Sequence, residues 1–192
     1  MRARIAAAAA RIMAEDGVED FATAKRKAAR QLGALDTQAL PTNEEVESEL
    51  LAYLALYQGE ESRSRLQALR AIALGAMRGL ASFNPYLTGP VLKGTASRYA
   101  DIDLQLFTDD RKGLELFLLN RNVPYETSEQ RRYCGDEPRE VQVLRLEWDG
   151  VPLSLAVHAA KDERSALKAS PGGRPIERAG INAVSALVAG GE

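Results

Sequence analysis

Hydrophobic residues recur every three or four positions through the first part of the chain, up to about residue 82. This spacing gives a helical segment one apolar stripe, so it predicts amphipathic helices. Gly17, Gly33 and Pro41 are typical of helix boundaries. We therefore expect four helices, at roughly 3–15, 20–32, 43–57 and 61–81. The clearest stripe, in the fourth helix, consists of Leu66, Leu69, Ile72, Ala73, Ala76 and Leu80.

From Tyr86 onward the pattern changes, because apolar residues begin to occupy every second position. Such alternation is typical of strands, whose successive side chains point to opposite faces of a sheet. It is clear in residues 101–107, and again in Val141–Trp148 and Val151–His158. Asp149-Gly150 between the last two is a strong signal for a two-residue hairpin turn. The remaining expected elements are a strand near 125–133 and helices at about 111–121 and 177–189.

Two regions are thus expected, a helical region over residues 1–82 and an α/β domain over residues 83–192. Together they predict an α+β fold in which helices pack on one face of a β-sheet. A two-residue turn would set the hairpin register so that Arg145 faces Ser154 and Leu146 faces Leu153. If the strands share one sheet, its open face carries Asp101, Asp103, Gln105, Arg145, Glu147, Ser154 and His158.

Composition narrows the classes of function. The chain has 192 residues and a net charge of -2, which argues against a bulk electrostatic grip on nucleic acid. Cys134 is the single cysteine, so no disulfide forms within the chain, as suits a reducing compartment. No apolar stretch approaches the roughly 20 residues of a membrane span, and the N-terminal segment lacks the features of a signal peptide. We therefore expect a cytoplasmic protein without a membrane partner.

Asp101 and Asp103 are the strongest candidates for a metal site. Carboxylates two residues apart on a strand lie on one face, at a Cα spacing of ~6.5–7 Å. Mg²⁺ is commonly bound by one or two carboxylates together with substrate phosphates and water. Alternation alone also fits a solvated edge strand with polar residues outward, so the preceding residues are needed to choose between the two interpretations.

The stretch Leu87–Leu104 reads LTGPVLKGTASRYADIDL. It resembles the signature of the minimal nucleotidyltransferases within the DNA polymerase β-like superfamily. In that signature a glycine turn is followed, after a second glycine, by two aspartates that alternate with hydrophobic residues. Gly89 and Gly94 stand at the glycine positions, and Asp101 and Asp103 at the metal-binding pair. The resemblance covers about residues 85–160 and leaves the N-terminal helices out.

The resemblance implies a mixed β-sheet of the nucleotidyltransferase type. It also implies that a nucleoside monophosphate is transferred from an NTP to a hydroxyl acceptor, with Mg²⁺ (or Mn²⁺) on Asp101 and Asp103. The acceptor could be an RNA or a protein. The residues assigned to nucleotide binding are Gly89, Lys93, Gly94 and Thr95. Those assigned to catalysis are Asp101, Asp103, Glu147 and Ser154.

The chain departs from the family pattern at two positions. Pro90 replaces the serine after the first glycine, and it has neither a hydroxyl nor an N–H to offer a phosphate. Ser154 stands where a third carboxylate is expected, and serine is a poor metal ligand and base. Glu147 is predicted on the same face, close across the hairpin, and is a possible substitute. A degenerate member that binds a nucleotide, an RNA or a protein without turnover is therefore the main alternative.

Other features suggest further alternatives. Lys25, Arg26, Lys27 and Arg30 make the second helix basic, which would suit a DNA-binding regulator or simply a solvated helix face. Arg131-Arg132-Tyr133 could supply a basic, stacking patch for RNA or a nucleotide base. His158, the single histidine, has no defined partner in the sequence, and such residues are more often on the surface than catalytic.

Overall fold

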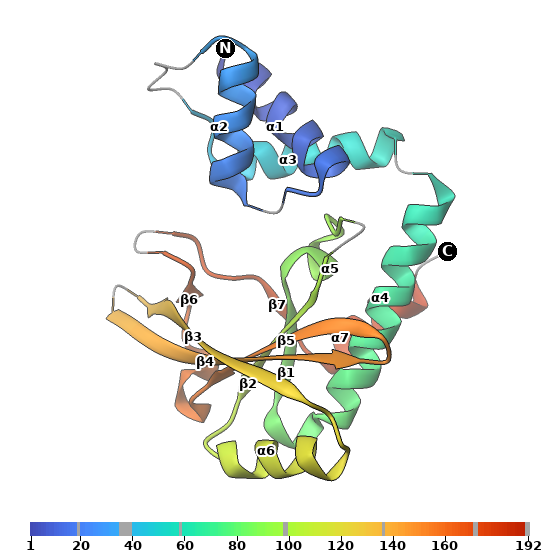
Figure 1. Ribbon diagram of the computed structural model, residues 1–192, viewed down its shortest axis with the longest axis vertical. Coiled ribbons are helices and arrows are strands. Elements are labelled where there is room, and N and C mark those ends of the chain that lie inside the picture. The colour runs from blue at the N-terminus through green and yellow to red at the C-terminus, as the bar shows by residue number, and fades with distance from the viewer. Residues whose placement is uncertain are drawn as a thin grey trace. The chain divides into compact units, whose positions relative to one another are not determined.

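The computed structural model describes residues 1–18, 20–34, 40–57, 59–97, 100–135, 137–170 and 173–190. The chain divides into two compact units (Figure 1). The helical unit consists of Met1–Leu66 and Gly94–Ala100, and the sheet unit consists of Gln67–Lys93 and Asp101–Glu192. The division falls within α4 (Glu60–Gly79), which contributes residues to both.

Three helices form the body of the helical unit: α1 (Arg2–Asp16), α2 (Phe21–Gln31) and α3 (Asn43–Tyr57). Small side chains dominate their shared core, which lets the helix backbones approach one another closely. Asp20 caps α2, because its carboxylate accepts a hydrogen bond from the Thr23 N–H at 2.7 Å. The buried residues of this core are Ile5, Ala6, Ala9, Ala10, Ile12, Met13, Ala24, Ala28, Ala29, Val46 and Leu50.

A capping box begins α3. The Glu45 N–H donates to the Thr42 hydroxyl at 3.2 Å, and the Thr42 N–H donates to the Glu45 carboxylate at 2.6 Å. Arg2 of α1 also donates to that carboxylate at 2.9 Å, through its Nε. Both side chains of this ion pair are about half exposed, so its contribution to stability is small.

The sheet unit is built on one mixed sheet, with the strand order β6-β3-β4-β5-β2-β1-β7. Its centre is β2 (Ile102–Phe107), which pairs parallel with β5 (Val151–His158) and antiparallel with β1 (Pro85–Thr88). The other pairs are antiparallel. They involve β3 (Tyr125–Cys134), β4 (Glu137–Trp148), β6 (Leu167–Lys168) and β7 (Arg178–Ala179).

The predicted hairpin register is confirmed. Arg145 pairs with Ser154, and Leu146 with Leu153. Asp149 and Gly150 both have positive φ, 49° and 78°, as a type I′ turn requires. However, β4 begins at Glu137, earlier than the alternation predicted, because it continues as a ribbon with β3 that is polar on both faces.

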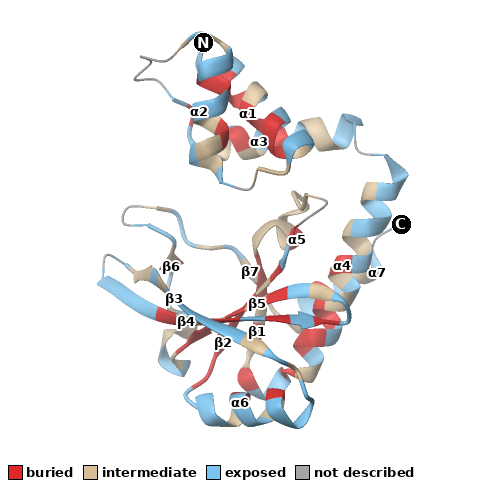
Figure 2. Cartoon of the chain, in the orientation of Figure 1, coloured by how far each residue is buried: buried red, intermediate tan, exposed pale blue. Residues whose placement is uncertain are grey.

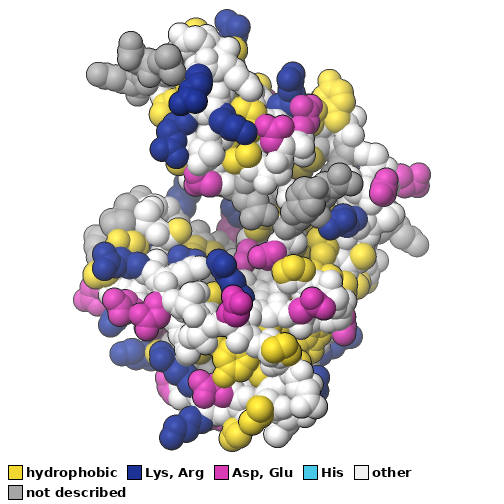
Figure 3. Space-filling model, in the orientation of Figure 1, with side chains coloured by type: hydrophobic (Ala, Val, Ile, Leu, Met, Phe, Trp, Pro, Cys, Tyr) yellow, Lys and Arg dark blue, Asp and Glu magenta, His cyan; other side chains and the backbone are white. Residues whose placement is uncertain are grey.

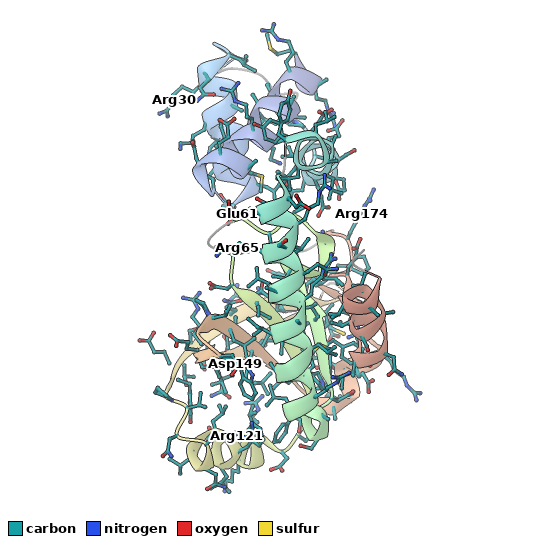
Figure 4. All side chains as sticks on the ribbon, turned by 90° about the vertical axis from the view of Figure 1, so that its right-hand side faces the viewer. Arg30, Glu61, Arg65, Arg121, Asp149 and Arg174 are labelled. Carbon is teal, nitrogen blue, oxygen red and sulfur yellow. The ribbon has the colours of Figure 1, made fainter. Side chains whose placement is uncertain are left out.

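Helices cover the apolar face of the sheet. Trp148 packs against α4, where a Cβ added to Gly79 would lie 3.2 Å from the indole. Arg121 follows α6 (Arg111–Asn120), and its guanidinium lies over the rings of Trp148 and Phe117 (Figure 4). Leu104, Leu144, Leu153 and Leu155 are buried on this face (Figure 2). The apolar side of the predicted alternation is therefore the core.

The sequence suggested that the polar face is open along its whole length, but the structure shows that part of it is covered. Gln105, Phe107 and His158 all lie on this face and are only 4%, 3% and 3% exposed. The prediction of a surface histidine was wrong, because η2 (Ala160–Arg164) begins two residues after His158 and contacts β2. In addition, the guanidinium of Arg178 covers the Phe107 ring.

Two further helices belong to the sheet unit. They are α5 (Gly89–Lys93), between β1 and β2, and α7 (Ile181–Ala189), which begins later than expected because β7 pairs with β1 before it. The fold is thus α+β with a mixed sheet. None of the helices in the described ranges is long and apolar enough to cross a membrane.

Candidate functional site

The turn from β1 into α5 lies directly against β2. Antiparallel pairing places Thr88 opposite Asp103. The next residue, Gly89, has φ +73°, and a Cβ built there would lie 2.5 Å from an oxygen of the Asp103 carboxylate. Only glycine fits both the left-handed backbone and this close approach. The first glycine of the motif and its second aspartate therefore lie side by side.

α5 is a single turn of five residues with a proline near its start. Pro90 has no N–H, so it removes one of the donors that a helix start offers to an anion. The other end of α5 is held by Arg70 of α4. Its Nε donates to the Val91 carbonyl at 3.1 Å and its Nη2 to the Leu92 carbonyl at 3.1 Å. Burial lowers the pKa of Arg70, a residue that sequence analysis did not identify.

The two aspartates differ in exposure. Asp101 precedes β2 and is exposed, whereas Asp103 is half-buried within the strand. Asp103 lies between Thr88 of β1 and Ser154 of β5 in the sheet register. Because the two aspartates are two positions apart, their Cα atoms are ~6.5–7 Å apart if the strand geometry of β2 extends to Asp101.

The structure places Ser154 beside Asp103 and Glu147 farther away. Glu147 pairs with Pro152, the residue that lies level with Asp101 when the parallel register of β2 and β5 is extended by one position. Two strand spacings separate the backbones of Glu147 and Asp101 by roughly 10 Å. The described residues contain no group of three or more His, Cys, Asp or Glu side chains that could hold a metal ion.

The residues assigned to nucleotide binding fall in both units. Gly89 and Lys93 belong to the sheet unit, where Lys93 ends α5 and is half-buried. Gly94 and Thr95 belong to the helical unit. Thr95 lines a cavity of about 390 Å³ in that unit, together with side chains that include Tyr53.

A cluster of basic and aromatic side chains occupies the covered end of the polar face. His158 stacks on Phe107 with ring centroids 5.2 Å apart. Burial lowers the pKa of His158 to about 4, and the nearby positive charges of Arg132 and Arg178 act in the same direction. The imidazole is therefore neutral near pH 7. Sequence analysis missed Arg178, which lies in a segment without periodicity, although it noted Arg132.

The basic helix α2 is partly engaged in internal contacts. Lys25 donates to the carbonyl of Pro41 at 3.1 Å and to the side chain of Asn43 at 2.8 Å. Lys27 forms an ion pair with Asp16 at 3.5 Å. Figure 3 nevertheless shows Lys and Arg side chains gathered on the surface of α2. The contacts of Lys25 and Lys27 give these two side chains a structural role.

Comparison with known proteins adds no assignment. No protein-family model matches the chain, and no curated protein matches it. Function must therefore be inferred from the geometry of β1, α5 and β2, and from the side chains that line the polar face of the sheet.

Proposed function

We propose that the sheet unit is a nucleotidyltransferase of the DNA polymerase β-like type. It transfers a nucleoside monophosphate from an NTP to a hydroxyl group on an acceptor such as an RNA or a protein. The observation that carries this proposal is the approach of Gly89 to Asp103, where even one added carbon atom would lie 2.5 Å from the carboxylate. A phosphate turn and a metal-binding strand are useful to this chemistry only when they adjoin.

The arrangement of strands supports the same proposal. β2 carries the aspartates at the centre of the mixed sheet, with β1 antiparallel on one side and β5 parallel on the other. The turn after β1 and the start of β2 therefore meet at one edge. A nucleotide bound there would have its phosphates near Gly89 and the aspartates.

Asp101 and Asp103 are the proposed ligands of Mg²⁺ or Mn²⁺. Two carboxylates fit Mg²⁺, which is usually held by few protein ligands, with water and substrate phosphates completing its shell. When bound, such an ion neutralises charge on the phosphates and orients them. Ser154 beside Asp103 is neutral near pH 7, so it can hydrogen-bond a ligand but does not serve as a base.

A second candidate is a nucleotide-binding protein of the same fold without turnover. The specific observations that favour it are Pro90 at the start of α5 and Ser154 in the place of a third carboxylate. The described residues also bring no third metal-binding side chain to the two aspartates. Without a base near the acceptor hydroxyl, transfer would be slow even if the nucleotide binds.

The first experiment measures binding. We expect thermal melts to show a higher Tm with Mg²⁺ or Mn²⁺ plus an NTP, because ligands that bind only the folded state stabilise it. Asp101→Asn and Asp103→Asn should abolish the shift. Asp149→Asn, in a hairpin turn whose positive φ suits asparagine, is the matched control and should keep it. An unchanged Tm in the unmodified protein would rule out both candidates.

The second experiment separates the candidates. The protein is incubated with α-labelled NTP, Mg²⁺ and RNA or protein acceptors, and label on the acceptor is measured. Transfer that is lost in Asp103→Asn supports the enzyme. A Tm shift without transfer to any acceptor supports the binding protein.

A further inference from the structure

The covered end of the polar face contains several buried polar atoms without partners. Four buried side-chain atoms in the described ranges have no hydrogen-bond partner. Three of them lie on this face: Oε1 of Gln105, Nε2 of His158 and Nη1 of Arg178. A buried polar atom without a partner costs stability, so native proteins rarely leave several together unless a ligand or water satisfies them.

Arg178 is held in place with part of its guanidinium free. The guanidinium lies 5.0 Å from the centre of the Tyr86 ring and 4.8 Å from that of Phe107. Its Nη2 donates to the carbonyl of Glu163, while the Tyr86 hydroxyl donates to the Glu163 carboxylate at 2.7 Å. These contacts fix the plane of the guanidinium and leave Nη1 buried without a hydrogen-bond partner.

Arg132 brings a second guanidinium to the same place. It extends from β3, is half-buried, and donates to the side chain of Gln130 and the carbonyl of Arg131. Burial lowers its pKa, and the charge of Asp103 partly opposes this effect. It also lies close enough to His158 to lower the pKa of the imidazole.

Two positive charges, on half-buried arginines, therefore lie near a buried, neutral imidazole. Among the described residues, no close ion pair joins Arg132 or Arg178 to a carboxylate, although the charge of Asp103 acts on Arg132 and that of Glu163 on Arg178. Like charges held near each other away from water are unfavourable unless an anion lies between them. Two guanidinium groups and three unpartnered polar atoms on one face therefore favour a binding site for an anion.

We propose that Arg132, Arg178 and His158 form a binding site for a phosphate group at the covered end of the polar face. Guanidinium groups donate paired hydrogen bonds to phosphate oxygens, and Nε2 of His158 supplies a further donor when it carries a proton. Two arginines match the charge of a phosphate monoester, which is about −1.5 to −2 near pH 7. Gln105 offers an acceptor to a ligand hydroxyl on the same face.

This site needs no metal, which separates it from the nucleotidyltransferase proposal. The phosphate group could belong to a nucleotide or to free inorganic phosphate. Both sources share the same chemistry, so the experiment compares them directly.

The single histidine makes the experiment direct, because its imidazole resonances are assigned without ambiguity. The protein is titrated with inorganic phosphate, AMP or ATP in the presence of EDTA, at constant ionic strength maintained with chloride. We expect saturable shifts of the His158 resonances in NMR spectra. Adenosine, which lacks a phosphate, is the ligand control and should leave them unchanged.

Substitutions test which side chains bind. Arg132→Gln and Arg178→Gln should weaken phosphate binding by roughly tenfold to a hundredfold, as expected for loss of hydrogen bonds to a charged group. Arg131→Gln is the matched control, because Arg131 is the exposed neighbour of Arg132 and its side chain points to the other face. Arg132→Lys keeps the positive charge and should weaken phosphate binding less than Arg132→Gln. Comparing these two variants separates loss of the charge from a failure of Arg132→Gln to fold.

A bound phosphate should also raise the pKa of His158 from about 4, since a nearby anion favours the imidazolium. The other charges that face the imidazole are Arg132 from β3, Arg178 from β7 and Asp162 from η2. Chloride alone producing the same shifts, or equal weakening by Arg131→Gln, would overturn the proposal. Binding of ATP but not of inorganic phosphate or AMP would assign the site to a nucleoside triphosphate. Phosphate binding without any nucleotide transfer would leave this site standing and the enzyme proposal rejected.

Discussion

At the scale of single residues, His158 stands out as a titratable side chain that is buried and therefore kept neutral. Its carbonyl accepts a hydrogen bond from the Thr108 N–H at 3.0 Å, and its ring stacks on Phe107. In the unfolded chain the same imidazole has a pKa of about 6.5. Folding therefore lowers the pKa of His158. At any pH where only the unfolded chain protonates this imidazole, proton binding favours the unfolded state.

The consequence is a pH-dependent stability. Above about pH 6.5 the imidazole is neutral in both states, so it contributes no pH dependence. As the pH falls from about 6.5 to about 4, only the unfolded state gains the proton, and the folded state loses up to about 3 kcal/mol relative to neutral pH. Below about pH 4 this contribution becomes constant. Urea unfolding at a series of pH values measures it.

His158→Phe is the comparison for that measurement. Phenylalanine fills a similar volume next to Phe107 and does not titrate. Acidic residues also titrate near pH 4, but they are shared by both proteins and cancel in the difference. A constant difference in unfolding free energy between pH 7 and pH 4 would show that folding does not shift the pKa of His158.

Residue positions were predicted more successfully than residue environments. Alternation and the Asp149-Gly150 turn correctly placed Arg145 opposite Ser154, because side chains in a strand repeat every two residues. The burial of His158 could not be predicted in the same way. It depends on η2 and Arg178, which are brought to the polar face by tertiary contacts.

At the scale of elements, the turn between β1 and α5 is the most constrained connection near the aspartates. We predict that Gly89→Ala destabilises the protein by at least about 2 kcal/mol, from the positive φ and the clash with Asp103 together. It should also remove the Tm shift caused by Mg²⁺ and NTP, because the carboxylate must move. Chemical unfolding and thermal melts measure the two effects.

Gly135→Ala provides the matched control. Gly135 also has a positive φ, +63°, but a Cβ built there meets no atom within 4 Å. It should cost only about 1 kcal/mol, from backbone strain alone, and should keep the Tm shift. Equal effects of both substitutions would mean that the contact between Gly89 and Asp103 has no special role.

Longer elements were predicted and the shortest were missed, for a physical reason. The β4–β5 hairpin has enough residues for an alternating pattern and ends in a turn with a strong local preference. β6 and β7 have only two residues each, too few to show a period. They exist because they pair with β3 and β1, which are distant in the sequence.

At the scale of the molecule, each unit has its own hydrophobic core. We predict that Ala9→Leu, which overpacks the core of the helical unit, destabilises that unit by about 1–3 kcal/mol. The His158 resonances, which report on the sheet unit, should not change. Ala7→Leu, on the exposed side of the same helix, should have little effect on either unit. Thermal melts and NMR spectra would test this, and altered His158 resonances in Ala9→Leu would contradict independent cores.

The motif itself runs through both units, which its sequence did not reveal. Gly89 and both aspartates belong to the sheet unit, whereas Gly94 and Thr95 belong to the helical unit. A linear pattern records the order of residues and the periodicity of each element. It does not record which core each residue joins, because that depends on contacts between distant segments.

The parallel pairing of β2 with β5 has a consequence for how the site forms. Ser154 and Asp103 are neighbours in the sheet, although α6, β3 and β4 lie between them in the sequence. Contacts between such distant residues are slow to form, since a long loop must close first, whereas the β4–β5 hairpin is local and quick. We therefore expect the hairpin to form before β2 pairs with β5. Under the proposed function, ligand binding at the aspartates should therefore appear late in folding, after β2 has paired with β5.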